Sequence, residues 1–108
     1  MPKKKIKISE NCCSIKDVID IIGGKWAMPI IYHLSKGKMR FKELERSVKG
    51  INTRMLVKEL KNMEANKIVT RKVFATVPPS VEYSLTLKGQ KLLPSIFSLY
   101  RWGQEFVV

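Results

Sequence analysis

The sequence predicts a mostly helical domain that carries one small β-hairpin. Over most of the 108 residues, apolar side chains recur with the period of amphipathic helices. The exception is the range 69–85, where two alternating segments flank a loop containing Pro78-Pro79, which is typical of a hairpin. Two helices joined by a tight turn precede this hairpin. The expected fold class is therefore a winged helix-turn-helix with additional helices at both ends.

Two amphipathic helices are expected at the start of this domain. The first has an apolar stripe formed by Ile15, Val18, Ile19 and Ile22. Gly23-Gly24 ends it abruptly. The second has an apolar stripe formed by Trp26, Ile30, Ile31 and Leu34. Pro29 is compatible with this second helix because it falls in or near the first turn, where backbone amides have no helical partner.

The helix-turn-helix is expected next, after a turn at residues 35–37 and a very short strand at 39–41. A short third helix is marked by Phe41, Leu44 and Val48, and Gly50 is expected to close it as a left-handed cap. Asn52 is a good N-cap for the following helix. The buried stripe of that helix is formed by Leu56, Leu60 and Met63, and its opposite face carries Arg54, Lys58 and Lys61.

The hairpin is expected to pair residues 69–73 with residues 81–85, and Pro78-Pro79 stiffens its tip. Thr86 can then cap a final helix that runs towards Val108 and is kinked at Pro94. This helix has two apolar stripes, Leu92, Ile96, Leu99 and Phe106 on one and Leu93, Phe97, Tyr100 and Val107 on the other. Packing inside one monomer is one explanation for two such faces. A homodimer interface is favoured, because a surplus apolar face usually marks an interface.

The charge of the chain indicates an anionic partner. Its 21 Lys and Arg against 9 Asp and Glu give a net charge of +12. Residues 36–72 hold twelve of the basic side chains and four Glu, a net +8 on about a third of the chain. Neutralising DNA phosphates and releasing their counterions is the obvious use of such a surface. A basic face that only confers solubility is the alternative, and a membrane surface is disfavoured because no separate amphipathic anchor accompanies the charge.

Length and composition predict one domain, at residues 13–108, preceded by a flexible basic arm at residues 1–12. Four lysines in residues 1–7 without an apolar segment are unlike a signal peptide, and no apolar run approaches the length of a membrane span. A cytoplasmic protein with reduced cysteines is expected.

Enzyme chemistry is not indicated. His33 is the only histidine, it lies among apolar residues of a helix, and a packing role is favoured over a catalytic one. Cys12 and Cys13 are too few for a zinc site, to which His33 would add at most a third ligand. No catalytic triad and no phosphate-binding loop stands out, so no metal and no cofactor is expected.

Several motifs in order resemble the HxlR family of bacterial winged-helix regulators. The most specific are Ile22-Gly23-Gly24-Lys25-Trp26 and Pro78-Pro79-Ser80-Val81-Glu82-Tyr83. Further matching segments are Cys13, Arg40-Phe41-Lys42-Glu43-Leu44, Gly50-Ile51, Arg54-Met55-Leu56 and Leu85-Thr86. The resemblance implies a transcription factor that binds inverted-repeat DNA as a homodimer built from its first and last helices. Many members have Ser-Pro where this chain has Asn52-Thr53, so base preference is expected to differ.

Roles follow for the candidate DNA-binding residues. Asn52, Thr53 and Arg54 open the recognition helix and approach base edges, and Arg54 either bonds a guanine or contacts a phosphate. The other candidates are phosphate, groove or wing contacts, namely Lys58, Lys61, Arg40, Lys42, Arg71, Lys72 and Thr76. Tyr83 is expected to pack inward, and Glu82 to orient a nearby basic residue.

Two questions stay open at this stage. A small basic RNA-binding or ribosome-associated protein is the alternative function, although exposed stacking aromatics, which such modules usually have, are not evident.

Cys13 precedes the first helix, whose positive end favours a thiolate, and it matches a cysteine that some members of the resembled family use to sense oxidants or electrophiles. Cys13 is therefore either a redox sensor or a buried interface residue. No inducer is assigned, and any signal is expected to act on the dimer itself.

Overall fold

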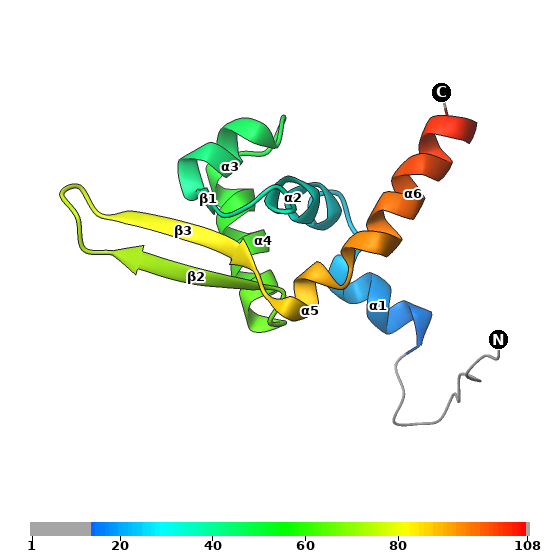
Figure 1. Cartoon of the computed structure of the whole chain (residues 1–108), viewed down its shortest axis with the longest axis horizontal. Helices are drawn as coiled ribbons and strands as arrows, with labels where there is room; N and C mark the ends of the chain where they lie inside the picture. The colour runs from blue at the N-terminus through cyan, green and yellow to red at the C-terminus, as the bar shows by residue number, and fades with distance from the viewer. Residues whose placement is uncertain (1–13, 108) are drawn as a thin grey trace.

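The computed structural model describes residues 14–107 as a helical body with a three-stranded antiparallel sheet (Figure 1). A hairpin formed by β2 (Val69–Phe74) and β3 (Ser80–Leu85) projects from one side of the body. The last helix, α6 (Leu93–Phe106), extends from the other side (Figure 1). The predicted fold class, a winged helix-turn-helix with extra terminal helices, is confirmed. The predicted basic arm and both cysteines lie outside the described residues.

The first helix, α1 (Ile15–Ile22), begins and ends where the sequence predicts. Ser14 is its N-cap and forms a capping box with Asp17: Ser14 Oγ accepts the amide of Asp17 at 3.3 Å, and the amide of Ser14 donates to Asp17 Oδ2 at 3.0 Å. Such a box satisfies two amides that the first turn would leave free. The helix ends at Gly23.

The second helix, α2 (Ala27–Leu34), forms the centre of the body. Pro29 is its third residue, so its ring lies in the first turn as predicted. Ile30, Ile31 and Leu34 are buried. His33 is partly buried, and its ring meets the ring of Tyr32 edge-on with centroids 5.7 Å apart, in agreement with the predicted packing role.

The helix-turn-helix consists of α3 (Phe41–Ser47) and α4 (Thr53–Ala65). Before it, β1 (Met39–Arg40) is one residue shorter than the predicted strand, because Phe41 already starts α3. The predicted cap at Gly50 is wrong in position. Val48 is the C-cap of α3, while Gly50 has φ +90° and turns the chain towards α4, a conformation that glycine adopts at little cost.

The sheet has the strand order β1-β3-β2, so β3 is its central strand. Both predicted hairpin strands are present and slightly longer than expected, with Val69 opposite Leu85 and Phe74 opposite Ser80. The short strand β1 pairs with the other edge of β3, which places Met39 opposite Tyr83. Because β1 leads directly into α3, this pairing joins the base of the wing to the helix-turn-helix.

The C-terminal segment differs from the single kinked helix that was predicted. Thr86 caps only α5 (Leu87–Gln90), and α6 starts afresh at Leu93. Pro94 lies in the first turn of α6, where its missing amide costs nothing, so it starts the second helix instead of kinking one long helix. The first half of α6 packs on α2, where the Tyr32 ring lies 6.0 Å from Phe97 and 5.7 Å from Tyr100 between centroids.

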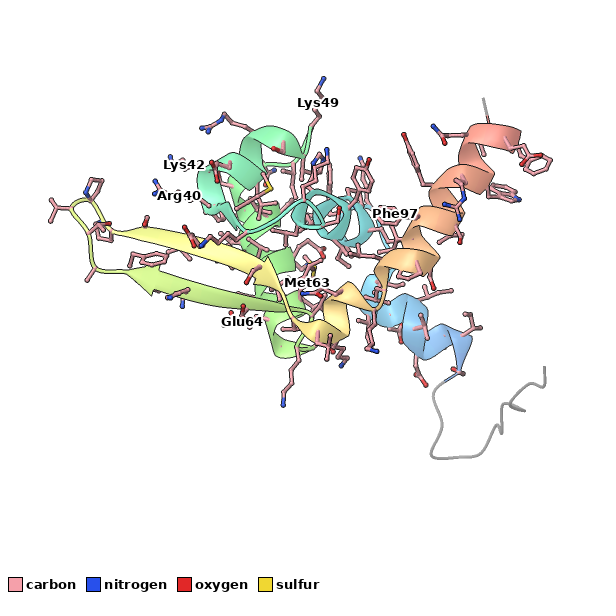
Figure 2. The ribbon with its side chains drawn as sticks, viewed as in Figure 1. Arg40, Lys42, Lys49, Met63, Glu64 and Phe97 are labelled. Carbon is pink, nitrogen blue, oxygen red and sulfur yellow. The ribbon has the colours of Figure 1, made fainter. Side chains whose placement is uncertain are left out.

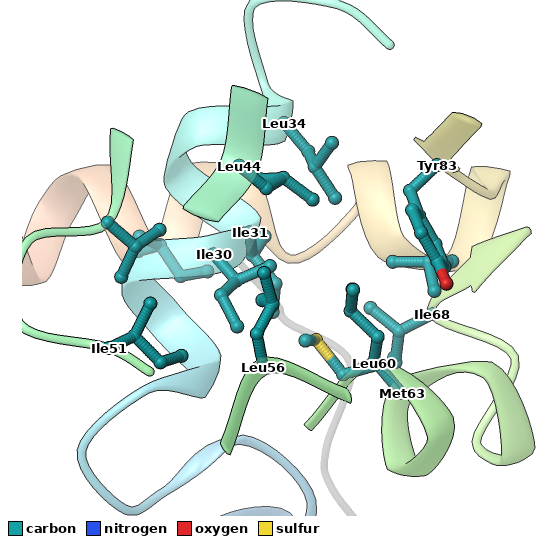
Figure 3. Packing of buried hydrophobic residues seen from close by; sticks show 13 residues of the cluster. Ile30, Ile31, Leu34, Leu44, Ile51, Leu56, Leu60, Met63, Ile68 and Tyr83 are labelled. Atoms are coloured by element: carbon teal, nitrogen blue, oxygen red, sulfur yellow. The ribbon is translucent and has the colours of Figure 1, made fainter. Parts of the chain in front are cut away.

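The hydrophobic core lies between α2, the two helices of the helix-turn-helix and the inner face of the sheet (Figure 3). The largest fully buried side chains are Ile30, Ile31, Leu44, Leu56, Leu60, Met63, Ile68 and Val69. Full burial of one such side chain stabilises a fold by about 1.5–3 kcal/mol. The buried stripe of α4 is the predicted one. It holds this helix with one face in the core and the opposite face towards solvent.

Candidate nucleic-acid interface

The outer face of α4 carries the three cations that the sequence predicts for it. Arg54, Lys58 and Lys61 are all exposed, on the side of the helix opposite its buried stripe. The predicted N-cap is confirmed, because Asn52 Oδ1 accepts the amide of Met55 at 2.8 Å. A helix N-terminus with a cationic outer face is therefore presented to solvent, where its free amides and positive dipole end favour an anion.

Thr53, the first residue of α4, is bonded to α3. Its hydroxyl donates a hydrogen bond to Glu45 Oε2. This bond joins the two helices of the helix-turn-helix where the recognition helix begins. Sequence reasoning assigned Thr53 to DNA and did not identify Glu45, because no local pattern reveals which residue of one helix meets the start of the next.

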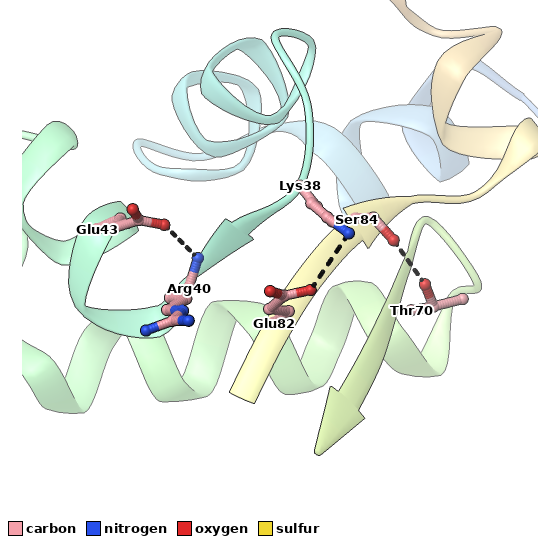
Figure 4. A network of polar contacts seen from close by, with 6 residues as sticks. All are labelled: Lys38, Arg40, Glu43, Thr70, Glu82 and Ser84. Atoms are coloured by element: carbon pink, nitrogen blue, oxygen red, sulfur yellow. Dashed lines mark hydrogen bonds and ion pairs between the residues drawn. The ribbon is translucent and has the colours of Figure 1, made fainter. Parts of the chain in front are cut away.

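Arg40 and Lys42 both lie exposed at the start of α3, as predicted (Figure 2). Arg40 is the N-cap residue, and its amide donates to Glu43 Oε1 at 2.7 Å (Figure 4). Both cations line a groove of about 800 Å³ between α3 and the wing tip, together with Arg46. Arg46 was not predicted as a DNA contact, although its position four residues after Lys42 places the two on one helical face.

Arg71 and Lys72, both predicted wing contacts, point to opposite faces of β2. Arg71 is the register partner of Tyr83, on the face that turns towards α4, and it lines a groove with Lys61 and Glu64. Lys72 lies on the other face, with Nζ 5.1 Å from the centroid of the Phe74 ring. The strict alternation of side chains along a strand causes this separation. The two cations therefore cannot share one contact surface.

The central strand β3 provides the groups that position the wing. Tyr83 is 8% exposed, so it packs inward as expected. Burial raises the pKa of the Tyr83 hydroxyl, and the nearby Arg71 guanidinium partly opposes this rise. Glu82 Oε1 lies 3.9 Å from Lys38 Nζ, and on the same outer face Thr70 Oγ1 lies 3.0 Å from Ser84 Oγ (Figure 4). Glu82 thus meets a basic residue, as predicted.

The wing tip is exposed, and one side-chain hydrogen bond closes it. The Thr76 hydroxyl donates to the carbonyl oxygen of Pro78 at 2.7 Å. Val77 next to it is fully exposed. Thr76 is therefore a surface residue, as a DNA contact must be, and it also has a structural role within the loop.

Two further groups of exposed side chains are apolar, one in α1 and one in the outer half of α6. In α1, Ile15 and Ile19 are 73% and 55% exposed. In the outer half of α6, Leu99, Trp102 and Phe106 are each more than half exposed and lie on one side of the helix. The two predicted stripes of α6 are thus buried or half-buried at their start and exposed at their end. Trp102 was missed, although it lies three residues after Leu99 and four before Phe106.

Within residues 14–107, no group of His, Cys, Asp and Glu side chains is arranged to hold a metal ion. Over the same range, every helix is too short or too polar to cross a membrane.

Comparison with known proteins extends these observations. The family model described as HxlR-like helix-turn-helix matches residues 21–108. The HTH-type transcriptional regulator YybR of Bacillus subtilis (strain 168) is 42% identical over 103 residues, which cover 95% of this chain and 82% of YybR.

Solved structures show the same likeness. The redox regulator HypR in its oxidized form has a TM-score of 0.81 and 43% identity, covering 86% of this chain and 96% of its own. A transcriptional regulator from Porphyromonas gingivalis W83 has a TM-score of 0.84 and 38% identity. The match covers 94% of this chain and 99% of that regulator. The match spans the helix-turn-helix, the wing and α6, and the chain therefore belongs to the HxlR-like helix-turn-helix family of transcriptional regulators.

Proposed function

We propose that this protein regulates transcription by binding inverted-repeat double-stranded DNA as a homodimer. The observation that carries this proposal is the outer face of α4, where three exposed cations follow an open helix N-terminus beside a projecting hairpin. A helix of this kind fits the major groove of B-DNA, which is wide enough to admit it. The net charge of +12 supplies the attraction to phosphates that holds the protein on the duplex.

In this proposal the first turn of α4 reads base edges. The Arg54 guanidinium is the principal reader, because it can donate to both O6 and N7 of a guanine. Asn52 and Thr53 lie beside it at the helix start. The Thr53 hydroxyl is bonded to Glu45, which leaves its methyl group to contact a thymine methyl. Lys58 and Lys61, one and two turns further along, contact phosphates or the groove edge.

In this proposal α3 and the wing, which flank α4, fix the position of the protein along the DNA. Arg40 and Lys42 at the start of α3 contact the sugar-phosphate backbone. The wing lies against the adjacent minor groove through Thr76 at its tip, while Arg71 and Lys72 act on its two faces. Contacts of this kind orient a protein on DNA without reading its sequence.

The homodimer in this proposal uses the exposed apolar residues of α1 and α6. Large exposed apolar side chains of this kind are typical of a protein interface and not of a DNA contact. A two-fold axis through this surface presents two recognition helices to successive major-groove segments, about 34–36 Å apart on an inverted repeat.

Regulation by oxidants or electrophiles through Cys13 forms part of the proposal. Cys13 immediately precedes Ser14, the N-cap of α1, in the sequence, and α1 contributes exposed apolar residues to the proposed dimer interface. The related structure of HypR is described as that of a redox regulator. Oxidation of Cys13 to a disulfide with its two-fold mate, or with a small thiol, would alter that surface.

A competition assay tests the nucleic-acid class. Genomic fragments that the protein retains at defined salt are sequenced, and a duplex from the recovered set is labelled. Unlabelled random duplex DNA and a structured RNA hairpin then compete for binding. The proposal expects an inverted repeat in the recovered set and competition mainly by DNA. Stronger competition by the RNA would support the RNA-binding alternative.

The redox proposal has a separate test. Wild type and Cys13→Ser are treated with diamide, and the dissociation constant for the recovered duplex is measured before and after. We expect a change only in the wild type, reversed by dithiothreitol. An unchanged wild type, or an equal response of Cys13→Ser, would assign Cys13 a structural role.

A further inference from the structure

The groove between α3 and the wing tip has two chemically different walls. The α3 wall carries the cations Arg40, Lys42 and Arg46. The wing wall, residues 76–81, is uncharged and contains two adjacent prolines. A proline has no backbone N–H, so this stretch of the loop has few donors for an anion. Any anionic group in the groove is therefore held by the α3 wall, while the wing wall limits the width of the groove.

The α3 wall is positive in spite of its one carboxylate. Glu43 also lines the groove, but its Oε1 accepts the Arg40 amide at 2.7 Å and so serves the cap of α3. Lys42 and Arg46 lie one helical turn apart on the same face, and both are exposed. The three cations line one side of the groove and can meet successive negative charges along an extended polyanion.

The geometry of DNA identifies that polyanion. One sugar-phosphate backbone separates each major groove from the neighbouring minor groove. With α4 in the major groove and the wing against the minor groove, this backbone runs along the groove between α4 and the wing. Phe41 and Val81 line both that groove and the groove between α3 and the wing tip, so the two grooves adjoin and the backbone can continue from the first into the second. We propose that the groove between α3 and the wing tip holds this backbone and that Arg46, together with Lys42, neutralises its phosphates. The proposal rests on the function proposed above and adds Arg46 as a residue that positions the protein without reading bases.

The uncharged wall has a defined part in this arrangement. The hydrogen bond from Thr76 to the Pro78 carbonyl holds the tip in one shape, and Val77 beside it is fully exposed. An apolar, rigid wall can pack against deoxyribose, which carries no charge. The wing therefore sets the distance between the backbone and α3, and the cations of α3 supply the attraction.

The salt dependence of binding tests this proposal. Each lost phosphate contact lowers the slope of log K against log salt by roughly 0.9, so between 50 and 200 mM salt the affinity of Arg46→Gln should fall about 3.5-fold less than that of wild type. The probes are a random-sequence 30-base-pair duplex and a duplex recovered from genomic fragments. Relative to wild type, Arg46→Gln should bind the two duplexes more weakly by the same factor. Arg46→Lys keeps the charge and should retain the wild-type slope.

The matched control is Arg101→Gln, which removes the same charge from α6, on the far side of the body from the groove (Figure 1). It should keep the wild-type slope, and circular dichroism should show all variants folded. Equal slopes for Arg46→Gln and Arg101→Gln would overturn the proposal. A change of base preference with an unchanged slope would overturn it too, because Arg46 would then read bases. If wild type itself binds neither duplex, the proposed function fails instead.

Discussion

The hydroxyl of Thr53 donates a hydrogen bond to Glu45 Oε2, which joins the start of the recognition helix to the preceding helix. The bond couples the position of α4 to that of α3, and α3 is in turn joined to the base of the wing through β1. The elements proposed to contact DNA are therefore connected to one another independently of the core beneath them. This connection makes Thr53 a residue whose substitution should affect both stability and binding.

Replacing Thr53 with Val, which has the same shape, should lower the free energy of unfolding by about 0.5–1.5 kcal/mol, because one hydrogen bond to a carboxylate is lost at an exposed site. Thr53→Ser keeps the hydroxyl and should retain most of this stability. Urea unfolding monitored by circular dichroism measures both. An equal or larger loss for Thr53→Ser would contradict this expectation, because the methyl group would then contribute at least as much as the bond.

Arg54→Ala should weaken binding to the selected operator by about 1–3 kcal/mol and relax base preference at one position of each half-site. Lys61→Ala, on the same face of α4, is the matched comparison. It should weaken binding to all sequences alike and reduce the salt slope. Binding titrations with a set of single-base operator variants distinguish the two. If Arg54→Ala lowers affinity for operator and random DNA equally, Arg54 contacts a phosphate.

If the proposed homodimer uses α6, Leu99→Ser combined with Trp102→Ser should convert it to a monomer, because both side chains are more than half exposed on the outer half of α6. Neither residue belongs to the buried core, so the fold should survive. Arg101 lies between them in the sequence but on the other side of the helix. The control variant Arg101→Gln should therefore have the same mass as wild type. Sedimentation velocity at several concentrations measures the mass. A dimer that persists in the double variant would place the interface on α1 alone or elsewhere.

Tyr83 should make stability depend on pH in the alkaline range. Burial raises the pKa of its hydroxyl above the ordinary value of 10.0, so the folded state holds this proton more tightly than the unfolded state does. Its contribution is complete below the unfolded pKa and is lost as pH rises through the folded pKa. The stability of wild type should therefore fall more steeply above about pH 10 than that of Tyr83→Phe, which lacks the ionisable group. Urea titrations between pH 8 and pH 11 compare the two slopes, and parallel curves would contradict the assignment.

Local patterns determined the elements of this protein. The spacing of Leu56, Leu60 and Met63 is a property of one helix, and Asn52 caps that helix through a bond to a residue only three positions away. The alternation in β2 and β3 is equally local. Such interactions join residues that are close in the sequence. For this reason the helices, the hairpin and the cationic face of α4 could be predicted.

Packing between distant segments decided the rest. The close packing of α5 against the residue before β2 is one such feature, because a Cβ on Gly89 would clash with the carbonyl oxygen of Ile68. The hydrogen bond between Thr53 and Glu45, and the position of Arg46 in one groove with the wing tip, depend on how α3 crosses its neighbours. Crossing angles arise from the fit of many side chains at once. The sequence by itself therefore determined which faces are cationic or apolar, and only the tertiary structure decided which of these faces lie side by side.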